Sequence, residues 1–285
     1  MTELGESSVF QKEIVRVNGN EKVNFIDNLA VEEPLEISIS VPQASPAIIN
    51  KNISITMRTP GHDADLAVGF LFTEGIISNP DQISDVTGVS NKINVHLNNS
   101  SDLDLSKLER HFYTSSSCGV CGKSSIDAIK TVCQLTHSPT SIQIDGELIK
   151  SFPDLLRKKQ DVFDRTGGLH AAVLFTREGD LISLREDVGR HNALDKLIGN
   201  AFMDNALPLD NKLLLLSGRA SFELIQKASM AGIQFVMAVG APSSLAVKLA
   251  MEFNMTLIGF LNKDRYNIYC GKERILNMEQ VTQGI

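Results

Sequence analysis

The feature that most constrains the fold is an alternation in the second half of the chain, where short apolar runs separate longer segments of helical periodicity. Apolar runs without charges are typical of strands that are buried on both faces of a sheet. Their alternation with helices therefore predicts an α/β sheet covered by helices. The expected strands are 212–217, 235–239 and 257–260, and the expected helices are 220–231 and 243–254, the latter capped by Ser243.

The pattern extends toward the N-terminus. Residues 168–176 and 181–186 flank Glu178-Gly179, which predicts a hairpin, and a helix is expected at 187–198 with Asp187 near its start. Apolar residues alternate at 35–41 and again at 53–57, which predicts strands with one apolar face each. The remaining expected elements are a helix from 63 to about 75, a strand at 92–97 and a helix at 124–134.

Residues 136–165 form the stretch with the weakest packing signal, because they combine polar turns with a basic patch at 157–159. A soft domain boundary is expected there. The prediction is an α+β chain of two domains. Residues 1–137 form a smaller, β-rich mixed domain, and residues 138–285 form the sheet covered by helices.

Composition excludes some classes of protein. A net charge of −7 lacks the basic excess of a broad nucleic-acid-binding protein. No apolar run approaches the ~20 residues that span a bilayer, and the N-terminus has no secretory pattern. We therefore expect a cytoplasmic protein that binds neither nucleic acid nor membrane. Cytoplasmic thiols are usually reduced, so the cysteines are interpreted as chemistry or packing before disulfides.

Cys118 and Cys121 lie three residues apart in a loop rich in serine and glycine, and they are the strongest chemical feature of the sequence. Lys123 and a following helix N-terminus favour a reactive thiolate. A zinc site would need a second cysteine pair, which Cys133 and Cys270 do not form. A redox dithiol belongs near a βαβ unit, which is not evident here. An exposed loop best fits a sulfur carrier, but the spacing alone hardly separates carrier and redox roles.

Three segments that contain glycine are candidate ligand loops: 58–62, 187–192 and 217–221. The third lies between a strand and a helix, where backbone N–H groups can bind an anion. Each segment could equally be a helix cap with a solvated arginine. No dinucleotide or P-loop glycine motif occurs. His170 alone is interpreted as structural, and the adjacent Glu186 and Asp187 should point apart as strand neighbours.

The chain resembles the FdhD family, the formate dehydrogenase accessory sulfurtransferases. The resemblance rests on an ordered series of segments rather than on the cysteine pair alone. These are 58–63, 69–75, 116–123, 166–171, 186–193, 217–221 and 241–244.

The resemblance implies a function. Members of this family take persulfide sulfur from a cysteine desulfurase and pass it to the molybdenum (or tungsten) bis-guanine-dinucleotide cofactor of formate dehydrogenase, which is bound as a substrate. Cys118 would carry the persulfide, with Cys121 as its partner. The cofactor-binding residues are expected at the predicted loops and near the C-terminus: Arg190, His191, Ser217, Gly218, Arg219, Ser221, Phe260, Leu261, Asn262, Lys263, Asp264 and Arg265.

The second half of this family is similar to the cytidine-deaminase fold. Zinc deaminases need His-x-Glu and Pro-Cys-x-x-Cys. Here Ala193 stands where the glutamate after His191 would be, and no Pro-Cys-x-x-Cys occurs. Deamination is therefore rejected, and no structural metal is expected. A non-catalytic chaperone that binds the molybdenum cofactor is the alternative function, and a homodimer is an expectation from the resemblance alone.

Overall fold

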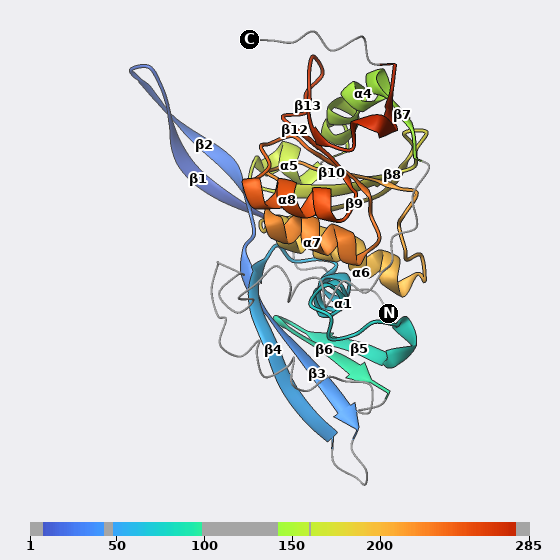
Figure 1. Ribbon diagram of the computed structural model, residues 1–285. Coiled ribbons are helices and arrows are strands. Elements are labelled where there is room, and N and C mark those ends of the chain that lie inside the picture. The colour runs from blue at the N-terminus through green and yellow to red at the C-terminus, as the bar shows by residue number, and fades with distance from the viewer. Residues whose placement is uncertain (1–7, 43–47, 99–141, 160, 278–285) are drawn as a thin grey trace.

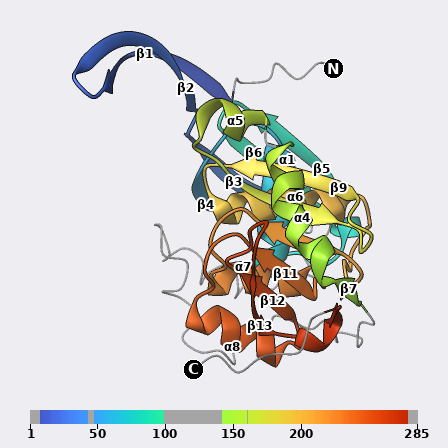
Figure 2. The ribbon, with the colours of Figure 1, turned by 90° about the horizontal axis from the view of Figure 1, so that it is seen from above.

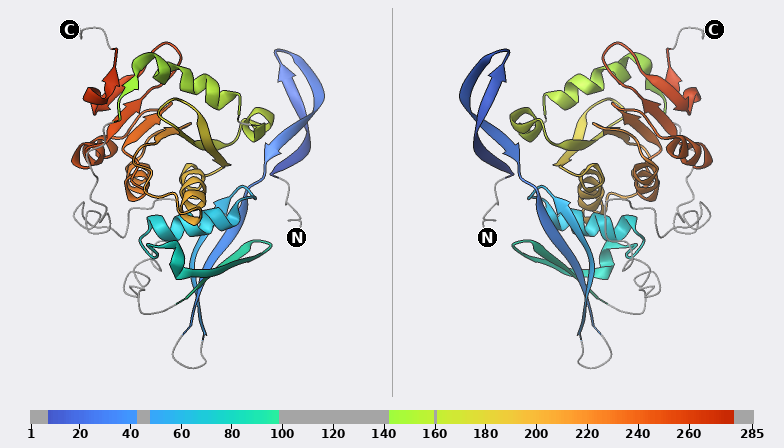
Figure 3. Two further views of the ribbon diagram at one scale, coloured as in Figure 1. Left: turned by 90° about the vertical axis from the view of Figure 1, so that its right-hand side faces the viewer. Right: turned by 90° about the vertical axis from the view of Figure 1, so that its left-hand side faces the viewer.

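The computed structural model describes residues 8–42, 48–98, 142–159 and 161–277, and it shows a mixed α+β chain built in layers. Figure 3 shows helices on both faces of the larger, six-stranded sheet and a further helix between it and the four-stranded sheet. The predicted α+β class is confirmed. The proposed likeness of the second half to cytidine deaminases stays a prediction.

The larger sheet has the order β13-β12-β11-β10-β8-β9 (Figure 1). Its centre consists of three parallel strands that are wholly buried, as the apolar runs predicted. These are β10 (Leu213–Leu216), β11 (Phe235–Ala238) and β12 (Thr256–Gly259). The predicted hairpin is formed by β8 (His170–Phe175) and β9 (Leu181–Asp187), and β13 (Asn267–Cys270) pairs with β12 at the other edge.

Helices cover both faces of this sheet. One face packs against α6 (Arg190–Met203), α7 (Phe222–Met230) and α8 (Ser244–Glu252). Ser243 caps α8 by accepting a hydrogen bond from the Ala246 amide, as predicted. The other face packs against α4 (Gly146–Arg157), with α5 (Asp161–Thr166) following. Two short strands, β7 (Ile144–Asp145) and β14 (Ile275–Leu276), pair beside α4.

Helix α4 corrects the expectation of weak packing at 136–165. Ile149 and Phe152 are fully buried, and Phe152 packs against Phe175 of the sheet with ring centroids 4.6 Å apart. The basic patch at 157–159 begins at the last residue of this amphipathic helix and continues beyond its end. Pro153 lies inside the helix. The expected boundary at 137/138 lies outside the described residues.

The smaller sheet has the order β4-β3-β6-β5, and α1 (Asp63–Thr73) packs against it. Its strands are β3 (Glu33–Pro42), β4 (Ile48–Arg58), β5 (Ile83–Val89) and β6 (Lys92–Leu97), and the short helix η1 (Pro80–Gln82) leads into β5. The alternation at Leu35, Ile37, Ile39 and Val41 is confirmed, since all four side chains are buried. One hydrophobic core runs from this sheet through α1 to α6 and the larger sheet.

The alternation predicted at 53–57 is only partly right. Ile53 is buried, but Ile55 and Met57 are 64 % and 47 % exposed. The pairing of β3 with β4 shifts register between Ile37 and Ser38, which leaves Ile53 as an extra residue. A bulge of this kind exchanges the two faces of the strand beyond it. Arg58 therefore points inward.

The first two strands form an arm that stands away from the body (Figures 1 and 2). Strands β1 (Val9–Asn18) and β2 (Glu21–Ala30) pair with each other, and no other described strand pairs with either. Their side chains are exposed over most of their length.

Within the described ranges, no helix has the length and hydropathy that crossing a membrane requires. The short helix η2 (Lys272–Arg274) precedes β14 near the end of the described chain.

Candidate functional site

The carboxyl ends of the three parallel strands meet at one edge of the larger sheet, and the start of β8 lies at the same edge because it is antiparallel to β10. A cavity of about 590 Å³ opens there. Its lining comes from the loops at this edge and from the C-terminal half of α4: Pro153, Asp154, Leu156, Arg157, Phe163, Gly167, Gly168, Leu169, His170, Ser217, Val239, Leu261, Asn262, Lys263 and Asp264. Open α/β sheets bind ligands at this edge.

The loops at this edge are joined by their backbones. The amide of Gly240 donates to the Gly218 carbonyl at 2.9 Å, and the amide of Phe260 donates to the Gly240 carbonyl at 3.1 Å. Phe260 adopts a positive φ of 54°, an uncommon conformation for a residue with a side chain. Backbone hydrogen bonds thus continue beyond the ends of the strands, and they set the position of the turn that follows Phe260.

That turn carries the segment predicted to contact a cofactor. The Asn262 side-chain oxygen accepts hydrogen bonds from the backbone amides of Asp264 and Arg265, at 2.9 and 3.0 Å. Leu261 is buried under the turn, and Lys263 is exposed at the cavity. A side chain bonded to its own backbone two and three residues on holds a tight turn. The Lys263 side chain therefore extends from a turn whose backbone is held in place.

The cavity wall carries charged side chains of both signs, so its cations can contact an anionic ligand. Lys263 and Arg157 supply two cations from different elements, whereas Asp154 and Asp264 supply two carboxylates. His170 lies at the wall, half-buried. Burial, with a contribution from Arg190, lowers the pKa of His170, so its imidazole is neutral at pH 7. A neutral imidazole can donate or accept a hydrogen bond.

The predicted cofactor residues divide into two groups. Ser217, Leu261, Asn262, Lys263 and Asp264 line the cavity, whereas Phe260, Arg265, Arg190, His191, Gly218, Arg219 and Ser221 do not. Gly218 lies just behind the wall, since a Cβ there would be 3.1 Å from His170 Nδ1. Arg219 is exposed, and the buried Nε of Arg190 has no hydrogen-bond partner among the described residues. The sequence interpretation missed His170 and Arg157 as cavity residues. The glycines at 167 and 168 before His170 were the available signal.

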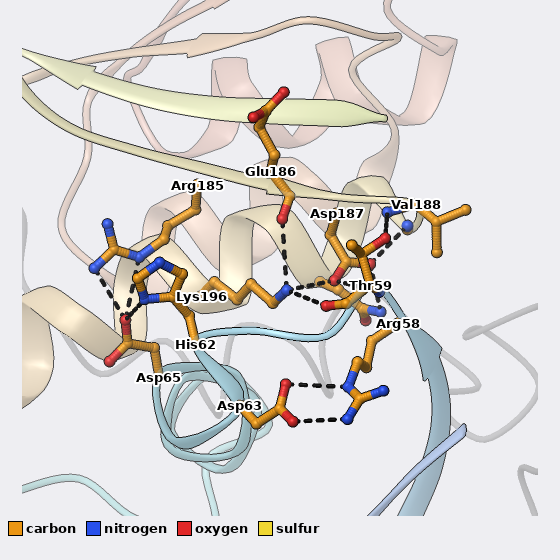
Figure 4. Close-up of polar contacts among 12 residues, drawn as sticks. Arg58, Thr59, His62, Asp63, Asp65, Arg185, Glu186, Asp187, Val188 and Lys196 are labelled. Atoms are coloured by element: carbon orange, nitrogen blue, oxygen red, sulfur yellow. Dashed lines mark hydrogen bonds and ion pairs between the residues drawn. The ribbon is translucent and has the colours of Figure 1, made fainter. Parts of the chain in front are cut away.

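The other two predicted ligand loops meet each other, but they form a buried network (Figure 4). Arg58 is fully buried and binds Asp63 with two hydrogen bonds of 3.0 and 2.8 Å. Asp187 is fully buried too, and it accepts from the backbone amides of Thr59 and Gly189 at 3.2 and 2.8 Å. These contacts tie β4 and α1 to β9 and α6. They leave the two loops little freedom to bind a ligand.

Lys196 completes this network from within α6. Its ammonium lies 2.7 Å from Asp187 and donates to the Thr59 carbonyl at 2.8 Å. A second set of ion pairs joins α1 to β9. Arg185 of β9 and His62, at the start of α1, both contact Asp65 of α1 (Figure 4). Burial opposes ionisation of Asp65, but hydrogen bonds from His62 and Arg185 outweigh it and lower its pKa. Glu186 faces away from Asp187, as expected for adjacent strand residues, and accepts from the Phe163 amide.

A second buried cluster, which the sequence interpretation did not anticipate, links α1, α6 and α7. The Lys227 ammonium contacts both carboxylate oxygens of Asp195 and the hydroxyl of Thr73, each at 2.9 Å. Asp195 and Lys227 are 2 % and 8 % exposed at their side chains. Lysine in a helical pattern is ordinarily a surface residue, so the sequence gives no signal for this pair.

His191 lies beside that cluster. Its Nε2 is 3.0 Å from a Glu223 carboxylate oxygen and 3.2 Å from the Ser221 hydroxyl. Burial, and then the neighbouring Lys227, Arg190 and His170, lower the pKa of His191 to about 4. The neutral ring therefore donates to Glu223, and His191 fixes the start of α6 against α7. Its predicted role in cofactor binding stays a prediction.

The lowered pKa of His191 predicts a pH-dependent stability. An unfolded histidine titrates near pH 6.5, so below that pH the unfolded chain binds a proton that the folded chain refuses until about pH 4. The melting temperature should therefore fall as the pH drops from 6.5 to 4. A His191→Gln variant should show a smaller fall over that range. Equal slopes for both proteins in a thermal melt series would contradict the burial of a neutral ring.

The predicted cysteine site lies outside the described residues, as Cys118, Cys121 and Cys133 all do. Cys270 is half-buried in β13, and burial raises the pKa of its thiol. It fits the packing role expected from the sequence. Within the part of the chain that the structure describes, no three histidine, cysteine or acidic side chains gather as a metal site.

The fold and the cavity define an α+β protein with a cavity lined by apolar and charged side chains at the carboxyl edge of a parallel sheet core. The model of the FdhD/NarQ family matches residues 30–276. The chain belongs to this family.

The relatives that carry a functional name include proteins from two distant organisms. The chain is 46 % identical to the sulfur carrier protein FdhD of Streptomyces avermitilis, with 96 % of this chain and 98 % of the relative covered. It is 46 % identical to the protein of the same name from Picrophilus torridus, over 90 % and 95 % of the two chains. A chain from Desulfotalea psychrophila assigned as a formate dehydrogenase accessory protein shares the fold, with a TM-score of 0.69, 22 % identity, and 95 % of this chain and all of that one covered.

Proposed function

We propose that this chain is a sulfur carrier that takes persulfide sulfur from a cysteine desulfurase and delivers it to the molybdenum bis-guanine-dinucleotide cofactor used by formate dehydrogenase. The cavity at the carboxyl edge is the observation that carries the proposal. Its wall contains the predicted segment 261–264 together with Ser217, and it offers cations from two elements. Family membership and the names of the relatives support the sulfur chemistry.

The first step loads the carrier. The Cys118 thiolate attacks the terminal sulfur of the donor persulfide, which forms a Cys118–sulfur bond and breaks the donor sulfur–sulfur bond. The donor cysteine leaves as a thiolate. No electrons are gained or lost overall, because the transferred sulfur keeps its oxidation level. The reactive form of Cys118 is the thiolate, so a lowered pKa would speed this step.

The second step delivers sulfide to the metal. Cys121 attacks the Cys118 sulfur and forms a disulfide, and the terminal sulfur leaves with two electrons as sulfide. The two cysteines supply those electrons, and a dithiol reductant must later reduce the disulfide. In the alternative arrangement, Cys121 only tunes the reactivity of Cys118. Residues at the cavity hold and orient the cofactor, which is the substrate of this reaction.

The competing function is a chaperone that binds the cofactor without moving sulfur. Activation of formate dehydrogenase in cells that lack their own sulfur carrier separates the two. The carrier predicts loss of activation in Cys118→Ala, with Cys133→Ala as the matched control. A Cys118→Ala protein that activates the enzyme at the level of the control would overturn the carrier and favour the chaperone.

Binding of the cofactor phosphates should depend on Lys263. Guanosine diphosphate is the probe, because it carries the nucleotide end of the proposed substrate. Lys263→Ala should weaken its binding by about tenfold to a hundredfold, the loss expected for a charge-assisted hydrogen bond of about 1.5–3 kcal/mol. Calorimetric titration measures this change, and Lys248→Ala is the control, since Lys248 is exposed on α8 away from the cavity lining. Equal affinities in both variants would remove Lys263 from the site.

The proposed partners follow from the same chemistry. They are a cysteine desulfurase as donor and formate dehydrogenase as the enzyme that receives the sulfurated cofactor; a homodimer is proposed from the family resemblance alone. The proposed location is the cytoplasm, where desulfurases and reducing conditions supply both the sulfur and the thiols.

A further inference from the structure

One histidine on the cavity wall has an imidazole ring that the protein leaves unengaged. The half-buried ring of His170 makes no hydrogen bond or ion pair with any residue that the structure describes. The other histidines in the described ranges, His62, His96 and His191, each have a ring nitrogen within 3.5 Å of a side-chain oxygen. Polar groups away from solvent are usually hydrogen-bonded, and an exception needs a reason, such as a catalytic role.

The backbone on both sides of the cavity edge fixes the position of this ring. His170 begins β8, and the next residue, Ala171, is bonded to Ser217 in both directions. The Ala171 amide donates to the Ser217 hydroxyl at 2.8 Å, and the Ser217 amide donates to the Ala171 carbonyl at 3.0 Å. The ring packs against Gly218, where a Cβ would lie 3.1 Å from Nδ1 and 3.3 Å from Cε1. The imidazole is therefore positioned before a ligand binds, as efficient chemistry on a bound ligand requires.

The surroundings of His170 keep its ring in the form that can accept a proton. Burial lowers the pKa of the imidazole, and the Arg190 guanidinium lowers it further, whereas Asp187 acts in the opposite direction. Lys263 and Arg157 lie on the wall of the same cavity, and their charges can hold an anion near the ring. A neutral imidazole can take a proton from such an anion, and an imidazolium cannot.

The delivery step of the proposed function needs a proton acceptor, and the inference made here rests on that function. When Cys121 displaces the terminal sulfur from a protonated persulfide on Cys118, the sulfur leaves as hydrosulfide, which carries one proton. A sulfido ligand carries none. The S–H bond must therefore break, its electron pair must stay on sulfur for the bond to the metal, and the proton must pass to a base.

We propose that His170 is the proton acceptor in sulfide delivery, and that its unprotonated ring nitrogen takes the proton of hydrosulfide as the sulfur binds the metal. An N–H bond forms and the S–H bond breaks, with no change of oxidation level. Where sulfide displaces an oxygen ligand of the metal, the imidazolium returns the proton to that oxygen, which leaves as hydroxide. The exchange of hydrosulfide for hydroxide is then balanced, and the ring is neutral again.

Replacing His170 with alanine tests this role and leaves space for added imidazole. The full chain is loaded with persulfide by a cysteine desulfurase and cysteine, and is then mixed with formate dehydrogenase from cells that lack their own sulfur carrier. The initial rate of activation should fall by about a hundredfold or more in His170→Ala, since a side chain that transfers a proton contributes at least about that factor. Imidazole in the assay should restore part of the rate. His96→Ala, on the smaller sheet, is the matched control and should deliver sulfur at the wild-type rate.

Two further measurements separate the possible results. Intact mass should show equal persulfide on the wild type and on His170→Ala; no persulfide on the wild type would overturn the proposed function itself. Equal delivery by the two loaded proteins would overturn only the role of His170, and so would a slow variant that imidazole does not restore. Calorimetric titration with guanosine diphosphate should show an affinity that changes far less than the delivery rate. An equal loss of both would make His170 a binding residue and would contradict its role as a base.

Discussion

Replacing Gly69 with alanine should destabilise the protein by about 3 kcal/mol, which is the upper part of the range for overpacking a core. Gly69 lies in α1 where that helix crosses α6. A Cβ at this position would lie 1.9 Å from the Asp195 carbonyl oxygen and 2.9 Å from the Gly199 amide nitrogen. Those atoms belong to the backbone, so no rotation of a side chain can relieve the clash. The two helices would have to move apart, which opens the core between the two sheets.

Gly199 makes the reciprocal contact, since its Cβ would lie 1.9 Å from the Asp65 carbonyl oxygen. Gly199→Ala should therefore cost a similar free energy of unfolding. Both glycines are helical, and alanine has a helix propensity more favourable by about 1 kcal/mol. Helix propensity alone would therefore make both alanine variants more stable, so a measured loss of stability can be attributed to the contact between the helices.

Chemical denaturation measures this prediction directly. Gly168→Ala is the control, because its added Cβ would meet nothing closer than 3.5 Å and its φ is not positive. It should change the free energy of unfolding by less than ~1 kcal/mol, as is usual outside a packed contact. If Gly69→Ala were as stable as this control, α1 and α6 would not cross at backbone contact.

Removing Asp195 should cause a loss of comparable size, about 3–5 kcal/mol, because it leaves the Lys227 ammonium buried without its main partner. Glu74 is the nearest remaining carboxylate, 3.7 Å away. This loss is expected for the single variant Asp195→Leu. Combining it with Lys227→Met should recover much of the stability, since two apolar side chains of similar size then fill the space.

Thermal and denaturant unfolding of the two single variants and the double variant form a double-mutant cycle. The two single losses should sum to well above the loss in the double variant. Additive losses would show that the two side chains do not depend on each other. In that case the contacts among α1, α6 and α7 would have to rest on apolar packing alone.

Much of the fold followed from the sequence because burial leaves a periodic pattern. The apolar runs 213–216 and 235–238 could hardly be anything but central strands, and both are fully buried. Helix α4 was not predicted because polar turns and the basic patch at 157–159 gave this stretch a weak packing signal, and the sheet that the helix covers cannot be read from its own residues. Ile55 and Met57 were assigned to the wrong face, since a bulge is a property of strand pairing and not of one strand.

The part of the candidate site that follows from strand order could be predicted from the sequence. Ser217 and the segment 261–264 follow strands whose carboxyl ends must meet, and they line the cavity. Arg157 and His170 come from elements whose neighbours depend on tertiary packing. The segment 58–62 looked like a ligand loop because arginine and glycine suit anions. Only the structure shows that Arg58 pairs with Asp63 inside the protein.

The most direct test of the central claim is the intact mass of the protein after incubation with a cysteine desulfurase and cysteine. Sulfur-carrier chemistry at a reactive thiolate predicts an added mass of about 32 Da that dithiothreitol removes. Cys121→Ala should still gain this mass, and Cys118→Ala should not. No added sulfur on the wild-type chain, with the desulfurase shown to be active, would contradict the carrier and favour the cofactor-binding chaperone.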